Sequence, residues 1–486
     1  MSAGDAARPN VLWVCTDQQR WDTLGCYGNE FVDTPNVDRL ASEGVRFDRA
    51  YCQNPFCTPS RASFLTGRYP RTTGVRTNGY PVPEDETLVT TALAEAGYRC
   101  GLSGKLHLSP EQPHDDADVL EEPTRRVRDG YSSFHWASGS HSGAHAEWLA
   151  GRDVEPTESD LSEGCPYVST SVPAEYHQTT WCVDRAVDFL TAHAGEDRPW
   201  LFSVNPIDPH APWNPPASYL ERYRDALDDI PLPNREPGEL DDKPAAQRRR
   251  RDESSGFHVD VPFDEVDDAD HRLIRAAYWA MVDLIDDGVG RLLDALEETG
   301  QREDTLVLFT SDHGEMLGDH AIYNKGTFFY EGAVRVPLVV SGPGVAAGVE
   351  SDALVELADL APTLLDAADV DRPHGMQGDT LWPLLRGEAD PDRHRESVYA
   401  EQYIDQDPAG ADVDAVYTMV RTDRYKLVRS HGTGEAELYD LEADPTETHN
   451  LASDPEHADA LAEMLALMTD RMSETADPKP ERQGDW

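Results

Sequence analysis

The chain has 486 residues, which is enough for one large domain with a sizeable core and a smaller companion. Lysine and arginine together number 42 and aspartate and glutamate number 92, so the formal net charge at pH 7 is −50. Because nucleic acid phosphates need basic partners, this charge argues against nucleic acid as a partner.

The carboxylates are spread along the whole chain rather than gathered in one tail. Such a surface is typical of proteins that stay soluble in concentrated salt, where repulsion between like charges is screened, and we expect a halophilic source. Lysine is rare and occurs at positions 105, 243, 325, 426 and 479. A lysine that such a composition retains is more informative than usual.

The N-terminal stretch MSAGDAARPNVLWVCTDQQ has no basic region, apolar core or twin arginine typical of an export signal. No apolar run approaches the roughly 18 residues of a membrane span. The seven cysteines show no CxxC spacing, and their odd number argues against a disulfide framework or a zinc site. We expect a cytoplasmic protein that does not bind membranes.

Strands and helices alternate along most of the chain, which predicts an α/β fold with a doubly wound sheet. Buried strands are predicted where apolar residues run together, and helices where they recur at helical spacing. The predicted elements are a strand at 10–16, a helix and turn at 34–47, a helix at 57–67, a helix at 87–96 with a strand after it, a strand at 200–204, a helix at 272–300, and strands at 305–310 and 335–344 followed by a helix at 354–370.

Two stretches interrupt this alternation. Residues 110–175 and 225–270 have little periodicity and are predicted to be long surface insertions, the second with a solvated or salt-paired RRRR run at 248–251. From about residue 390 the pattern changes to antiparallel strands and a last helix near 456–474. We therefore expect a large α/β domain at 1–388 and a smaller α+β subdomain, built on an antiparallel sheet, at 389–486.

Polar clusters follow four of the apolar stretches, where the sites of open α/β sheets lie. They are Asp17-Gln18, Lys105 with His107, Asp208 with His210, and Asp312-His313. A lone aspartate after a strand is more often a cap or turn residue, but two such clusters favour a divalent cation site. Their oxygen-rich ligands suit Ca²⁺ or Mg²⁺, and the histidine leaves Mn²⁺ as an alternative.

The stretch NPFCTPSRASFLTGRYP, residues 54–70, places Cys57 at a predicted helix start, with Pro59 in the first turn and Arg61 one turn on. A helix N-terminus favours anions and lowers the pKa of a thiol. Position 57 is therefore either a nucleophile next to an anion site or a buried structural cysteine with Arg61 in a surface pair. Chemistry alone leaves both alternatives open.

The motif CTPSR followed by LTGR resembles the signature of type I sulfatases, in the alkaline phosphatase superfamily. Further motifs resemble this family in its order along most of the chain: VLWVCTDQQ, GKLHL, NPIDPHAPW, TSDHGEMLGDHAIYNK and ELYDLEADPTETHNLA. The resemblance implies a large mixed, mostly parallel sheet sandwiched by helices. Two of the rare lysines, Lys105 and Lys325, fall on the family's functional positions.

The resemblance implies that Cys57 is oxidised to Cα-formylglycine by a formylglycine-generating enzyme. One hydroxyl group of the hydrated aldehyde attacks sulfur, and the second allows sulfate to leave, in two steps that are easier than one. The resemblance also implies a divalent cation, with Ca²⁺ as the expected ion, held by Asp17, Gln18, position 57, Asp312 and His313. The roles implied for the other residues are positioning of position 57 by Arg61 and His107, sulfate binding by Lys105 and Lys325, proton donation by His210, and substrate contact by Asn78.

The pair Asp17-Gln18 departs from the two aspartates of many family members. The same pair occurs in some sulfatases and in phosphonate monoester hydrolases that share the formylglycine, so a phosphonate or phosphodiester substrate is an alternative to a sulfate monoester. Lys105 and His107 favour a sulfate substrate, because the phosphonate enzymes tend to lack this pair of residues. A third alternative is a silent binding protein in which Cys57 is not converted. A small aryl, alkyl or sugar sulfate is the expected substrate, and a homo-oligomer is compatible with the sequence.

Overall fold

The computed structural model describes residues 8–109, 128–139, 142–155, 159–160, 165–253, 261, 263–404 and 415–479. The large sheet found in these residues contains β1 (Asn10–Thr16), β2 (Gly44–Tyr51), β3 (Arg99–Gly104), β4 (Tyr131–Trp136), β7 (Trp200–Asn205), β8 (Thr305–Ser311), β9 (Arg335–Ser341) and β10 (Val349–Glu356). Their order is β10-β2-β9-β8-β1-β7-β3-β4, and β9 runs antiparallel to both neighbours while the other pairs are parallel. Two further strands, β5 (Ser159–Asp160) and β6 (Ser169–Thr170), form a separate antiparallel pair.

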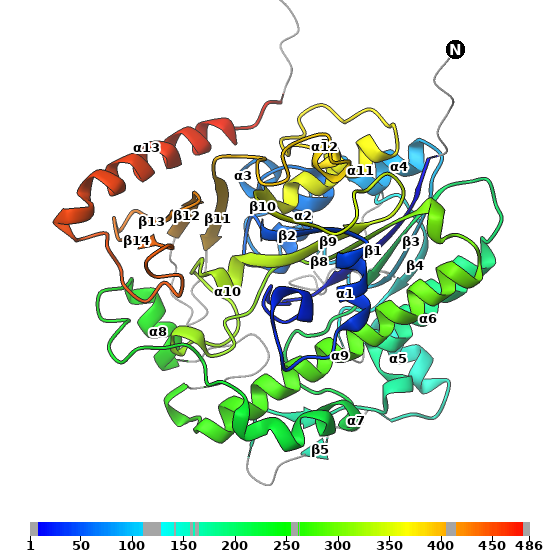
Figure 1. The fold of residues 1–486 in the computed structure, drawn as a ribbon, viewed down its shortest axis with the longest axis horizontal. Helices are drawn as coiled ribbons and strands as arrows, with labels where there is room; N and C mark the ends of the chain where they lie inside the picture. Colours follow the sequence, from blue (N-terminus) through cyan, green and yellow to red (C-terminus); the bar gives the residue numbers. More distant parts are fainter. Residues whose placement is uncertain are drawn as a thin grey trace, which may run out of the picture.

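Helices cover both faces of the sheet (Figure 1). One face carries α2 (Cys57–Thr66), α4 (Val89–Glu95) and α11 (Leu360–Ala367), and the other carries α1 (Pro35–Ser42), α6 (Gln178–Ala192) and α9 (Asp268–Glu298). In β1, Val11 and Trp13 pack on the first face and Leu12 and Val14 on the second, because successive side chains of a strand alternate. The predicted mixed, mostly parallel sheet sandwiched by helices is confirmed.

Two segments near the β10 end of the large sheet differ from the sequence predictions. The predicted helix and turn at 34–47 ends at α1, and β2 begins at Gly44. The predicted helix at 354–370 is wrong at its start, because β10 continues to Glu356 and α11 begins only at Leu360. The apolar spacing of this stretch fits a helix, but pairing with β2 holds Leu354–Glu356 extended.

The interpretation of 110–175 as an insertion is wrong in part, and residues 110–127 lie outside the described residues. Tyr131–Trp136 forms β4, which pairs with β3 at one end of the sheet. Its sequence, YSSFHW, carries a weak apolar signal because an edge strand is only half covered. The stretch also holds α5 (Gly143–Ala150), and 225–270 holds α8 (Ala245–Glu253).

A second, antiparallel sheet follows in the described part of the C-terminal region, as predicted. It consists of β11 (Val398–Ile404), β12 (Ala415–Arg421), β13 (Tyr425–His431) and β14 (Ala436–Asp440), and α13 (Ala458–Glu474) packs on it through Met464 and Met468 (Figure 1). Buried Lys426 of β13 ties this sheet to the large domain by an ion pair of 2.7 Å with Glu331, and it forms a second ion pair of 2.7 Å with Glu447 of the C-terminal region. A domain boundary at 388 stays a proposal.

The described residues also contain four short helices, α3 (Pro70–Thr73), α7 (Ala217–Leu220), α10 (Glu331–Val334) and α12 (Trp382–Leu385).

Among the described residues, no helix combines the length and the apolar character that crossing a membrane requires. In the RRRR run, Arg248 of α8 donates hydrogen bonds to the backbone carbonyls of Leu240, Asp241 and Lys243, so this arginine binds the loop that precedes its helix.

Asp286 of α9 caps a different helix, α1. Its two carboxylate oxygens accept hydrogen bonds from the backbone N–H groups of Asn36 at 3.1 Å and Val37 at 2.8 Å. The Asp286→Ala variant leaves these donors unpaired and is expected to lower the free energy of unfolding by about 2 kcal/mol. Urea denaturation measures the change. Asp294→Ala, at an exposed position of the same helix, is the control, and equal losses for both variants would contradict the capping role.

Candidate active site

Two neighbouring strands bring four polar side chains to one edge of the large sheet. β1 and β8 pair in parallel, so the residues that follow them emerge side by side. Asp17 and Gln18 follow β1, Asp312 and His313 follow β8, and all four are buried. The structure thus brings together the two clusters that the sequence predicts at strand ends.

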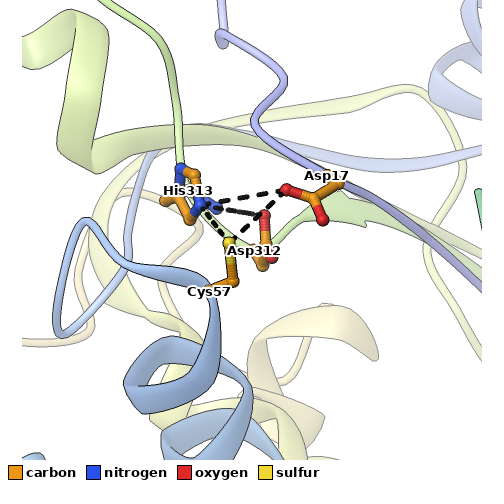
Figure 2. A group of neighbouring side chains, drawn as sticks. All are labelled: Asp17, Cys57, Asp312 and His313. Carbon is orange, nitrogen blue, oxygen red and sulfur yellow. Dashed lines mark hydrogen bonds and ion pairs between the residues drawn. The ribbon is translucent and has the colours of Figure 1, made fainter. Parts of the chain in front are cut away.

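Cys57 faces these strand ends from the first residue of α2 (Figure 2). Its Sγ lies 3.2 Å from Nε2 of His313 and 3.7 Å from Oδ1 of Asp17. The helix begins here because Phe56 is extended, and it ends at Gly67, whose φ of 65° is readily adopted by glycine. The predicted helix and its start at Cys57 are confirmed.

Charges around Cys57 favour its ionised form. Burial raises the pKa of the thiol, but the positive charges of Lys105 and Lys325, together with the His313 imidazole and a hydrogen bond from His107, outweigh burial and hold the pKa well below its usual value. Elsewhere burial dominates: it raises the pKa of the Cys100 thiol to about 12. The surroundings of position 57 therefore stabilise negative charge there.

The residues present fit a divalent cation. Asp17, Cys57, Asp312 and His313 each offer one ligand atom, and these atoms lie within 4.8 Å of one another. Nδ1 of His313 donates to the carbonyl of Gly314 at 2.9 Å, which leaves the Nε2 lone pair facing the group. Two carboxylates in such a set suit Ca²⁺ or Mg²⁺, and the imidazole suits Mn²⁺ as well.

Gln18 has a backbone conformation that non-glycine residues rarely adopt, with φ at 65°. Two side chains hold it there: Oδ1 of Asp312 accepts a hydrogen bond from its N–H at 3.0 Å, and the hydroxyl of Tyr278 donates to its carbonyl at 2.5 Å. This conformation turns the Gln18 side chain into the site, where Oε1 lies 2.6 Å from Nζ of Lys325.

Arg61 lies beneath the two carboxylates. Its Nε donates to Oδ2 of Asp312 at 2.9 Å, its Nη2 lies 3.6 Å from Oδ2 of Asp17, and its Nη1 donates to the carbonyl of Lys105 at 2.9 Å. The sequence interpretation placed Arg61 against position 57 itself. In the structure this buried guanidinium donates hydrogen bonds to Asp312 and the Lys105 backbone and forms an ion pair with Asp17.

Lys105 enters the site from the end of β3. The preceding residue, Gly104, has a φ of 98°, and a Cβ atom there would lie 1.9 Å from the carbonyl oxygen of Asn205 on β7, so only glycine allows this approach. Nζ of Lys105 is 2.5 Å from Oδ2 of Asp17. Burial lowers the pKa of Lys105, but Asp17 and Cys57 outweigh it and the pKa is raised.

His107 and Asn78 both contact the first turn of α2. Nδ1 of His107, a residue with φ at 57°, is 3.3 Å from Oγ1 of Thr58. Oδ1 of Asn78 accepts a hydrogen bond of 2.9 Å from the backbone N–H of Thr58. The sequence interpretation gave Asn78 a substrate contact, and in the structure its side chain also caps the helix that carries Cys57.

Lys325 and His210 complete the group. Nζ of Lys325 is 3.2 Å from Sγ of Cys57 and 2.9 Å from Nε2 of His210. Nδ1 of His210 donates to the carbonyl of Ala211 at 2.6 Å, so Nε2 is the nitrogen that accepts from Lys325. The structure thus gathers residues 17, 18, 57, 61, 105, 107, 210, 312, 313 and 325 at one buried site.

Sequence reasoning missed Thr58 and Glu315. Glu315 is buried and accepts a hydrogen bond from the Gln18 side chain. A charged residue in a loop usually faces solvent, so its sequence carried no signal of a buried partner. Only the folded loop shows the contact.

The family model described as Sulfatase matches residues 9–370, and one described as N-sulphoglucosamine sulphohydrolase, C-terminal, matches residues 318–474. The chain is 33% identical to the uncharacterized sulfatase YidJ of Escherichia coli K12, over 97% of this chain and 88% of that protein. It is 31% identical to an arylsulfatase of Clostridium perfringens, over 93% of this chain and 92% of that protein. The fold superimposes on a phosphonate monoester hydrolase from Silicibacter pomeroyi with a TM-score of 0.83 and 28% identity, over 96% of both chains.

The match spans the large sheet, the strand ends that carry Asp17 and Asp312, and the helix that begins at Cys57. The curated relatives are covered over most of their own length. The chain is therefore an enzyme of the sulfatase family.

Proposed function

We propose that the chain hydrolyses a sulfate monoester with position 57 as the nucleophile, after conversion of Cys57 to formylglycine. The observation that carries this proposal is the position of Cys57, which stands in the motif CTPSR at a helix N-terminus and within 3.2 Å of both His313 Nε2 and Lys325 Nζ. The proposed cation is Ca²⁺, with Mg²⁺ or Mn²⁺ as alternatives, held by Asp17, Gln18, position 57, Asp312 and His313.

In this proposal the side chains bind and orient the ester. Lys105 and Lys325, both buried, neutralise the sulfate oxygens, and because their charges already lie in a fixed site they need little reorganisation. Arg61 keeps the two metal-binding carboxylates in place. When bound, the cation supplies positive charge that favours an ionised hydroxyl at position 57 and polarises the ester. When formed, formylglycine supplies one hydroxyl for attack on sulfur and a second for release of sulfate.

His210 is the proposed general acid: Nε2, which accepts a hydrogen bond from Lys325 in the structure, would first take up a proton and then deliver it to the leaving oxygen. Because a poor leaving group needs this proton more, His210→Ala is expected to lower kcat by about 10²- to 10⁴-fold on an alkyl sulfate and far less on nitrophenyl sulfate. Steady-state rates on both esters test this role. Equal losses on the two substrates would assign His210 to binding instead.

Removing the cation is expected to abolish turnover and to lower the unfolding temperature. A cation present at 100 times its dissociation constant stabilises the protein by about 2.7 kcal/mol, which a chelator removes. Thermal unfolding with and without chelator, followed by addition of Ca²⁺, Mg²⁺ or Mn²⁺ in turn, identifies the ion that restores both properties. Unchanged activity and stability after complete chelation would contradict the metal site.

The mass of the tryptic peptide Ala50–Arg61 tests the nucleophile directly. After alkylation of protein from its own host, Cys52 in this peptide should carry the alkyl group, whereas position 57 should have the mass of an aldehyde and remain unmodified. An ordinary thiol at position 57 would favour the silent binding protein over the enzyme. Aldehyde at position 57 would also imply a formylglycine-generating enzyme as maturation partner.

A phosphonate monoester or phosphodiester hydrolase is the second candidate. It is favoured by the Asp17-Gln18 pair and by the likeness to the Silicibacter pomeroyi enzyme. Phosphonate monoesters and phosphodiesters carry one negative charge, as sulfate monoesters do, so both classes of ester suit the same cationic site. Values of kcat/KM on nitrophenyl sulfate and on nitrophenyl phenylphosphonate, measured with one enzyme preparation, decide between the two classes.

The cellular setting of the enzyme stays a prediction. All seven cysteines are free in the structure, which fits a reducing cytoplasm and leaves Cys57 available for conversion. The acidic composition supports a halophilic source. Cell fractionation and activity as a function of salt concentration test these two expectations.

A further inference from the structure

Glu315 lies directly behind the candidate metal site and has no part in the roles described above. It follows His313 and Gly314 in the loop after β8, and it is fully buried. Its Oε2 accepts a hydrogen bond from Nε2 of Gln18. Its Oε1 accepts hydrogen bonds from the backbone N–H of Leu317 at 3.0 Å and from that of Asn324.

These contacts decide which way the Gln18 amide points. A carboxylate can only accept, so it binds the NH₂ end of the amide and turns the oxygen to the opposite side. On that side, Oε1 of Gln18 lies 2.6 Å from Nζ of Lys325, which in turn is 3.2 Å from Sγ of Cys57. We propose that Glu315 is a positioning residue that orients Gln18 so that its oxygen faces the cation, an inference that rests on the proposed metal centre.

Glutamine needs such a partner because its two ends differ. A carboxylate at position 18 would present an oxygen in either orientation, whereas a flipped glutamine would turn an N–H donor toward the cation and Lys325. The Glu315 carboxylate also places a negative charge one side chain behind the ligand, where it compensates for the charge that Gln18 lacks. Glu315 therefore adapts the site to an amide ligand.

The same carboxylate holds the loop that delivers Lys325. Leu317 and Asn324, whose N–H groups Glu315 binds, have φ values of 50° and 63°, which lie in the left-handed region. Asn324 directly precedes Lys325 in the chain. One buried side chain thus joins the end of β1, the loop after β8 and the lysine at the nucleophile.

The isosteric variant Glu315→Gln tests the orientation. In this variant, Oε1 of the new amide still accepts hydrogen bonds from the N–H groups of Leu317 and Asn324. Its NH₂ group then faces the NH₂ group of Gln18, and because two donors cannot bond to each other, the Gln18 amide must flip. We expect the affinity for Ca²⁺ to fall about 10- to 100-fold, as measured by titration calorimetry of chelator-treated protein. All proteins come from one host, and peptide masses confirm equal conversion of position 57.

A double variant that combines Gln18→Glu with Glu315→Gln tests whether Ca²⁺ affinity can be restored. In this double variant the amide at position 315 donates to the carboxylate at position 18, whose other oxygen faces the cation, and the summed charge of the pair is unchanged. We expect Ca²⁺ affinity near that of the wild-type protein. A purely structural role for Glu315 predicts no recovery of affinity, because the second substitution adds a further change to the same buried contact.

Asp286→Asn is the matched control, because Asp286 is also a buried carboxylate that accepts backbone N–H groups. It should lower stability and leave Ca²⁺ affinity unchanged. Wild-type affinity in Glu315→Gln, or a double variant that binds no more tightly than Glu315→Gln, overturns the inference alone. A wild-type protein that binds no divalent cation overturns the metal centre and the inference together. If Glu315→Gln does not fold, the double variant decides, and its failure to fold or to bind also overturns the inference.

Discussion

The Cys57→Ala variant is expected to lose at least roughly 10⁵-fold in kcat/KM on an aryl sulfate, because it removes the atom that the proposed mechanism uses to attack sulfur. The rate of hydrolysis of the aryl sulfate is measured at an enzyme concentration high enough to detect this remaining activity. Cys52→Ala is the matched control, because Cys52 is a buried cysteine of the same peptide and its backbone N–H donates a hydrogen bond to the carbonyl of Val334. Activity of Cys57→Ala near that of the wild type would contradict a nucleophile at position 57.

A serine at position 57 separates the two chemical steps. The hydroxyl of Cys57→Ser can attack sulfur, but it lacks the second hydroxyl that releases sulfate. We expect at most one product molecule per enzyme and a sulfated peptide Ala50–Arg61 in the mass spectrum. Steady turnover by the serine variant would show that release does not need formylglycine.

The Lys325→Gln variant is expected to lower kcat/KM by about 10²- to 10³-fold, the effect of removing one fixed charge that stabilises a developing oxyanion. The ammonium group of Lys325 contacts Gln18, Cys57 and His210, so its charge lies at the nucleophile itself. Rates are measured on nitrophenyl sulfate at saturating Ca²⁺, after peptide mass analysis shows equal conversion of Cys57.

Lys479→Gln is the control for this substitution, because Lys479 lies near the surface and its ion pair with Glu86 spans 3.5 Å. Such a pair contributes at most about 1 kcal/mol to stability, and turnover should not change. Equal effects of the two substitutions would show that loss of any lysine harms this acidic chain. A Lys325→Gln enzyme within a few-fold of the wild type would remove Lys325 from the proposed mechanism.

The metal-site residues could be predicted because they are local consequences of strand ends. Asp17 and Asp312 each follow a continuous apolar run, and parallel strands carry such residues to one edge. Burial of Lys105, Lys243, Lys325 and Lys426 agrees with the expectation that lysines retained in this composition are informative. The direction of Arg61 could not be predicted, since its partner Asp312 lies 251 residues away.

Strands at or next to the two ends of the large sheet were the main difficulty in predicting the fold. β1 and β8 are buried on both faces and their sequences are mostly apolar, whereas β2 and β4 contain arginine, aspartate or serine at positions that are at least partly exposed. An alternation of this kind is weak in a short segment, and pairing with a neighbouring strand decides the outcome. β10 shows the same effect, because a stretch with helical spacing becomes a strand beside β2.

The sequence by itself determined the α/β class, the helix that begins at Cys57, the polar clusters at the strand ends and the antiparallel C-terminal sheet. Each of these depends on apolar spacing or on residues close to one another in the chain. Only the tertiary structure decided that Arg61 binds Asp312, that Gln18 adopts a left-handed conformation, and that Glu315 holds the Gln18 amide. These contacts join segments far apart in the sequence, and their energy comes from buried charges and hydrogen bonds that exist only once the strands have assembled.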